Sequence, residues 1–131
     1  MYSSPDIKTV PSASSVVETA SMLKKQLEDH GITIYGHIDQ QSEAVKSGLS
    51  LKPLQLIIFG NPKRGIPLMN ANPLCALDLP LKLLIWEGEE KKVWVSYNQF
   101  EYLQKRFDLP GNLIQNLSKV ESIILLALNH S

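Results

Sequence analysis

The first residues of this chain that could do chemistry lie in a glycine-flanked segment, residues 60–65, which follows an apolar run. Its two glycines have the spacing of a phosphate-binding loop, in which backbone N–H groups hold a nucleotide. Such a loop continues with lysine and a hydroxyl residue, whereas this chain continues Ile66-Pro67. Nucleotide hydrolysis is therefore not expected. Lys63 and Arg64, beside the glycines, form either a small anion site or a solvated turn.

A second group of residues has the types needed for acid–base chemistry. Tyr35, His37 and Asp39 alternate along an expected strand and so share one face, with His37 and Asp39 about 7 Å apart. A His/Asp pair can orient a general base, and Glu87 offers a further carboxylate. No nucleophile accompanies them. Cys75 lies in an apolar segment, between leucine and alanine, and such a setting is typical of an inert, buried thiol. An enzyme using His37, Asp39 or Glu87 is thus the least favoured hypothesis, and solvent-facing strand residues are the simpler interpretation.

Neither a metal nor a cofactor is expected. Cys75 is the single cysteine, which excludes an intramolecular disulfide. His30, His37 and His130 are scattered, whereas zinc ligands usually come in closely spaced pairs. No cofactor fingerprint accompanies them.

Polar residues near predicted strand ends favour a different site, one for a small ligand. Asp78 and Lys82 frame the entrance of an expected strand that Glu87 ends, and Tyr97 lies near the end of the next strand. Loops restrained by proline and glycine at strand ends are a common ligand position. The favoured hypothesis is a module that binds or senses a small ligand, an anion being one option. Its candidate residues are Asn61, Lys63, Arg64, Met69, Asp78, Lys82, Glu87 and Tyr97.

These residues must be positioned by a sheet and two long helices. Ser15 and Glu18 have capping-box spacing, the stripe of apolar residues behind them predicts a helix, and Gly31 ends it. A second long helix is predicted at 112–129, with short ones at 42–47 and after a capping Asn98. Strands are predicted at 6–10, 32–39, 54–59, 81–86 and 93–97, the last two joined as a hairpin and 54–59 as an inner strand. In residues 32–39 the three isoleucines should share one face. Prolines and glycines argue against a long regular helix or a central strand in residues 60–73.

The order of these elements favours one α+β domain over residues 1–131. Only one helix separates two strands at full crossover length, so an alternating parallel fold is a poor fit. A mostly antiparallel sheet with two long helices packed on it fits better.

Composition excludes several partners. Thirteen Lys and Arg balance thirteen Asp and Glu, so neither nucleic acid nor a membrane surface is an expected partner. Residues 1–10 contain no apolar stretch of signal-peptide type, and the longest apolar run, 123–128, is far shorter than a membrane helix. We therefore expect a cytoplasmic protein.

Three motifs resemble the family catalogued as domain of unknown function 302, and the resemblance spans about residues 5–128. They are Phe59-Gly60-Asn61-Pro62 with Gly65-Ile66-Pro67-Leu68-Met69; Asp78-Leu79-Pro80-Leu81-Lys82 running to Trp86-Glu87; and Val93, Val95, Tyr97 and Asn98 followed by Tyr102, Leu103 and Arg106. Two departures are Arg64, where the family often has a small residue, and Gly88-Glu89-Glu90 in place of its acidic turn.

The resemblance implies a strand, helix, four-strand, helix fold with a curved sheet, similar to the TATA-binding-protein-like arrangement, and a homodimer. It implies no settled activity. The alternative hypothesis is therefore a structural or interaction protein that acts as a homodimer, in which Asn, Pro and Gly at 60–73 serve turn chemistry only.

Overall fold

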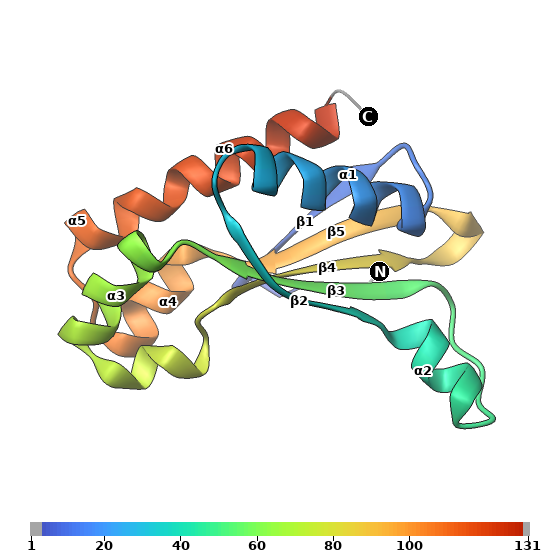
Figure 1. Cartoon of the computed structure of the whole chain (residues 1–131), viewed down its shortest axis with the longest axis horizontal. Coiled ribbons are helices and arrows are strands. Elements are labelled where there is room, and N and C mark those ends of the chain that lie inside the picture. Colours follow the sequence, from blue (N-terminus) through green and yellow to red (C-terminus); the bar gives the residue numbers. More distant parts are fainter. Residues whose placement is uncertain (1–3, 130–131) are drawn as a thin grey trace.

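A five-stranded sheet organises the computed structural model, which describes residues 4–129 (Figure 1). Its strands lie in the order β1-β5-β4-β3-β2, and every neighbouring pair is antiparallel. Their bounds are Ile7–Ser12 (β1), Thr33–Asp39 (β2), Leu54–Gly60 (β3), Leu81–Glu87 (β4) and Val93–Asn98 (β5). The predicted α+β class, the antiparallel sheet and the inner position of β3 are confirmed.

The two predicted long helices lie on one side of this sheet (Figure 1). The first, α1 (Val16–Asp29), begins at Ser15, whose side chain accepts the N–H of Glu18 and donates its own hydroxyl to the Glu18 carboxylate. Gly31 follows the helix with a φ of 75°, which glycine adopts without strain. The C-terminal helix is divided into α5 (Gly111–Ile114), the 3₁₀ turn η3 (Gln115–Leu117) and α6 (Ser118–Asn129).

The two faces of the sheet differ in their cover. Since directly opposed residues share a face, the register separates a covered face, beneath α1 and α6, from an uncovered one. The covered face is the core and includes Ile57, Phe59, Leu83, Ile85 and Val95. No helix of residues 4–129 covers the other face (Figure 1). This uncovered face includes Ile7, Thr9, Leu54, Leu56, Ile58, Leu84, Trp86, Trp94 and Ser96, together with Lys82 opposite Ile58 and Asn98 opposite Ile7.

The prediction that residues 60–73 hold no long regular helix is wrong, because α3 spans Pro62–Ala71. Asn61 caps it by accepting the N–H of Lys63 at 3.0 Å. Pro62 occupies the first turn, where a missing N–H costs nothing. Only Pro67 lies in the helix interior, and the burial of Leu68 beside it favours the helix over a loop. A 3₁₀ turn, η1 (Pro73–Leu77), follows after Asn72.

Two further predictions need correction. Asn98 does not cap a helix: it stays in β5, opposite Ile7, and α4 (Phe100–Phe107) begins after Gln99. The N–H of Gln99 bonds to the carbonyl of Asp6, which holds the chain extended for one residue longer.

The isoleucines of β2 do not share one face. A bulge at Tyr35 shifts the register between residues 34 and 36, so Ile34 lies opposite Phe59 on the covered face and Ile38 opposite Leu56 on the uncovered one. A one-residue insertion reverses the side chains beyond it.

Candidate functional site

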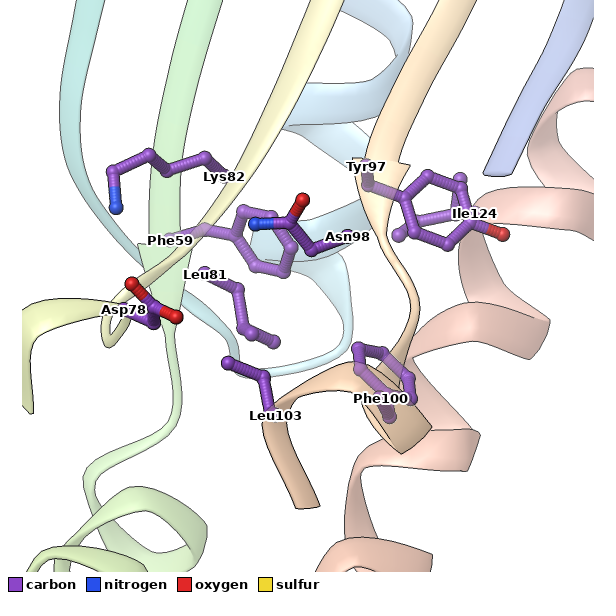
Figure 2. A pocket seen from close by; sticks show the side chains of 9 residues that line it. All are labelled: Phe59, Asp78, Leu81, Lys82, Tyr97, Asn98, Phe100, Leu103 and Ile124. Atoms are coloured by element: carbon purple, nitrogen blue, oxygen red, sulfur yellow. The ribbon is translucent and has the colours of Figure 1, made fainter. Parts of the chain in front are cut away.

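Three of the predicted ligand residues, Asp78, Lys82 and Tyr97, meet at a small cavity at one end of the sheet (Figure 2). We call it the strand-end cavity, and its volume is about 40 Å³. It forms because β3 and β5 end where β4 begins, and because α4 and α6 close the space beyond. Its lining is Phe59, Asp78, Leu81, Lys82, Tyr97, Asn98, Phe100, Leu103 and Ile124.

The polar rim of the strand-end cavity carries one uncompensated positive charge. Arg106 donates from Nη1 to both carboxylate oxygens of Asp78, at 3.0 and 2.8 Å, and the pair raises the pKa of the guanidinium. Lys82 makes no ion pair with residues 4–129, and its Nζ donates only to the carbonyl of Pro80 at 3.4 Å. The side-chain amide of Asn98 has no hydrogen-bond partner in this part of the chain. Figure 2 shows the Lys82, Asn98 and Asp78 side chains around the apolar Phe59 and Leu81.

Tyr97 contributes its ring to the cavity, whereas its hydroxyl points away toward α6 (Figure 2). That hydroxyl donates to Glu121 Oε2 at 2.7 Å, and Lys8 Nζ lies 3.6 Å from the same oxygen. Burial, and then the bond to Glu121, raise the pKa of Tyr97 well above its ordinary value. Tyr97 therefore stays neutral and forms a wall rather than a ligand donor.

The raised pKa of Tyr97 has an expected effect on stability. Below about pH 10 both the folded and the unfolded chain hold the proton, so the contribution is constant. Above it the unfolded chain releases the proton first, so the free energy of unfolding falls. From pH 9 to 11 we expect urea titrations to show about 1.4 kcal/mol more loss in the wild type than in Tyr97→Phe. Equal losses in the two proteins would contradict this assignment.

Two other predicted residues, Asn61 and Met69, line a separate apolar cavity of about 100 Å³ beside α3. Leu81 borders both this cavity and the strand-end cavity, so the single pocket expected from the sequence is divided in two. Lys63 and Arg64 lie in the first turn of α3 and line neither.

Glu87 lies at the opposite end of β4 from Lys82. It borders an open hollow of about 970 Å³, which we call the tryptophan hollow. Trp86 and Trp94 pair across the hairpin there, with ring centroids 6.5 Å apart. The other lining residues are Leu51, Lys52, Pro53, Leu54, Gly88, Glu89, Glu90 and Lys92.

The acid–base candidates do not assemble. His37 Nε2 lies 2.6 Å from Gln55 Oε1, and Asp39 accepts the N–H of Ser42 as the cap of α2 (Gln40–Lys46). No hydrogen bond or ion pair within the described residues joins His37, Asp39 or Glu87 to one another. The thiol of Cys75 is buried, and this burial raises its pKa.

Metal ligands are likewise dispersed over residues 4–129. No group of three or more His, Cys, Asp or Glu side chains there could hold an ion. His130 lies outside the described residues.

Two polar residues at the strand-end cavity are not among the sequence candidates: Asn98, which lines it, and Arg106, which binds the lining residue Asp78. The sequence pattern places Asn98 at a helix cap, and it gives no role to Arg106, which holds Asp78. Both belong to the third motif, so their position beside Tyr97 and Tyr102 is the signal that could have found them.

Known proteins resemble this chain at the level of sequence and of fold. Two relatives, each named "Fluoride-specific ion channel FluC 1", come from Brucella suis biovar 1 (strain 1330) and Brucella abortus biovar 1 (strain 9-941). Each is 38% identical over 101 residues, or 77% of this chain, and the chain spans only 40% and 37% of their lengths. No helix within residues 4–129 has the length and apolar character needed to span a bilayer.

A solved structure shares the fold. It is the uncharacterized conserved protein DUF302 from Bacillus stearothermophilus, with a TM-score of 0.79, 19% identity, and coverage of 96% of this chain and 98% of that one. The family model for "Domain of unknown function DUF302" matches residues 8–126. This chain therefore belongs to the DUF302 family, as its motifs predicted.

Proposed function

We propose that the chain is a small-anion binding module whose site is the strand-end cavity. The observation that carries the proposal is the ammonium of Lys82, which makes no ion pair with residues 4–129, at a rim that also carries the unpartnered amide of Asn98. Because Arg106 neutralises Asp78, the rim has a net charge that attracts an anion. The apolar floor strengthens such an attraction by lowering the local dielectric constant.

The size of the cavity selects the ligand. Organic ligands need pockets of about 300–1,000 Å³, whereas the strand-end cavity offers about 40 Å³. A water needs roughly 10–15 Å³ on such a measure, so a monatomic anion with a water or two is the largest fitting guest. The name of the Brucella relatives supports the same chemistry, and fluoride is the first anion to test.

The test is a fluoride titration followed by ¹⁹F NMR, with chloride and acetate as larger anions. We expect saturable fluoride binding by the wild type. Lys82→Met should weaken it about tenfold or more, since hydrogen bonds to charged groups contribute about 1.5–3 kcal/mol. Lys25→Met, at an exposed position of α1, is the matched control and should bind like the wild type. An absence of saturable fluoride binding would rule the proposal out, and equally strong binding of acetate would contradict the size limit of the cavity.

A second function, as an interaction protein that acts as a homodimer, is supported by the uncovered face. That face carries Leu54, Leu84, Trp86 and other large apolar side chains that no helix of residues 4–129 covers. The sheet edges are less suited to pairing, because Pro11 in β1 lacks an N–H and β2 is interrupted by its bulge. Sedimentation equilibrium at micromolar concentration should give the mass of a dimer, and a monomer throughout would exclude this function.

A further inference from the structure

One segment of the chain has a regular structure but no core of its own. The α2 arm, residues 39–52, projects from one end of the sheet, on the opposite side from α1 and α6 in the view of Figure 1. None of its side chains is buried. Three large apolar residues are among them: Val45 is 69% exposed, Leu49 68% and Leu51 41%.

The helix of the α2 arm is capped at both ends. Asp39 caps the start of the helix through the N–H of Ser42. At its end Gly48 has a φ of 73°, and the N–H of Leu49 bonds to the carbonyl of Ala44 at 2.8 Å, which is a Schellman motif. Even capped, a helix of seven residues is marginal in water without packing. A capped helix that presents Val45 and Leu49 to solvent indicates a partner surface.

The tryptophan hollow is apolar with an acidic border, and so it matches the apolar residues and the lysine of the α2 arm. Trp86 and Trp94 supply apolar area, and Gly88 lies close to both side chains, where a Cβ would come within 3.1 Å of Trp86 and 3.3 Å of Trp94. Glu87, Glu89 and Glu90 border the hollow, and none makes an ion pair with residues 4–129. Lys52 and Lys92 also border it, which leaves one net negative charge.

We propose that the α2 arm of each copy inserts Val45 and Leu49 into the tryptophan hollow of a second copy. This inference rests on the homodimer function above and names its contact. Lys46, exposed between the two apolar residues and held only by a 3.7 Å surface pair to Glu43, then meets the acidic rim of the partner.

The occupant is a second copy because arm and hollow adjoin in one chain. Leu51 and Lys52, at the base of the α2 arm, are also part of the lining of the hollow. A two-fold axis near that base places each arm beside the other copy's hollow, so a single symmetric contact satisfies both surfaces. The arms also lie toward the uncovered face (Figure 1). The exchange of arms between the two copies is therefore compatible with pairing of their uncovered faces.

Sedimentation equilibrium on three variants tests the exchange. The arm variant is Val45→Asp with Leu49→Asp, and the hollow variant is Glu89→Lys with Glu90→Lys, all at exposed positions that leave the core intact. Each should raise the dimer Kd at least about tenfold. The control is Val17→Asp on α1, which is equally exposed at 65% and should leave the Kd unchanged.

A mixture of the arm and hollow variants gives the decisive result. The mixed dimer regains one intact arm–hollow contact, and its second contact sets two aspartates against two lysines. The mixture should therefore dimerise more tightly than either variant alone. A dimer whose Kd is unchanged in both variants would overturn the exchange while leaving the homodimer function standing. A wild type that is monomeric at every concentration would overturn both, and neither result bears on fluoride binding.

Discussion

Replacing Phe59 by alanine is expected to lower the free energy of unfolding by about 3–5 kcal/mol. The ring is 2% exposed and lies between Ile34 of β2 and Leu81 of β4 on the covered face. It also forms part of the floor of the strand-end cavity. Its removal leaves a void that the packed neighbours cannot fill, so both transfer free energy and packing contacts are lost. Urea-induced unfolding measures the loss as a shift of the midpoint at constant slope.

The comparison for Phe59 is an apolar residue that has no packing to lose. Val17→Ala, at an exposed position of α1, should change the free energy of unfolding by less than about 0.5 kcal/mol. A loss below about 1 kcal/mol in Phe59→Ala would contradict the burial of this ring and its place in the floor of the site.

The sequence predicted those elements whose local signals agree with their tertiary environment. α1 has a capping serine, one apolar stripe and a terminal glycine, and all three are used in the fold. β3 is a continuous apolar run because it is an inner strand, and β4 and β5 form a hairpin with the tryptophans opposed. In each case the local preference and the burial favour the same structure. That residues 1–131 form a single domain stays a prediction.

The prediction for residues 60–73 is wrong because two local signals conflict there. Prolines and a glycine disfavour a helix, whereas Asn61 as cap and Pro62 in the first turn favour one. The burial of Leu68 decides the outcome, and burial is a tertiary property. The bulge at Tyr35 is still harder to predict from the sequence. The apolar and polar residues alternate through it without interruption, so the pattern gives no sign of the inserted residue.

The candidate site could be predicted only as a set of residue types. Asp78, Lys82 and Tyr97 do meet at one cavity, since they lie at neighbouring strand ends. Glu87 is close to them in sequence, but seven residues of extended strand place it at the far end of β4. The position of Asn98 could not be predicted, because it depends on Gln99 bonding to Asp6, a contact between residues far apart in the sequence.

Replacing Asn72 by alanine is expected to cost about 2–3 kcal/mol, less than Phe59→Ala but more than the loss of a single helix cap. Its side chain makes two bonds that no other residue replaces. The carbonyl oxygen accepts the N–H of Leu74 at 3.1 Å and so begins η1, and the amide donates to the carbonyl of Phe107 at 2.8 Å. The second bond ties η1, which leads to Asp78, to α4, which carries Arg106. Asn72 therefore holds together the two elements whose ion pair borders the strand-end cavity.

Two control variants, Asn61→Ala and Asn72→Ser, distinguish the contributions of the two hydrogen bonds of Asn72. Asn61 caps α3 through the N–H of Lys63 alone, so Asn61→Ala should cost only about 1 kcal/mol. Asn72→Ser keeps an acceptor for Leu74 but is too short to reach Phe107, so it should lose about 1 kcal/mol for that bond. Urea titrations of the three variants should give Asn72→Ala as the least stable. If Asn72→Ala were as stable as Asn61→Ala, the tie to Phe107 would contribute nothing, and α4 would have to be held beside η1 by packing and the Asp78–Arg106 pair.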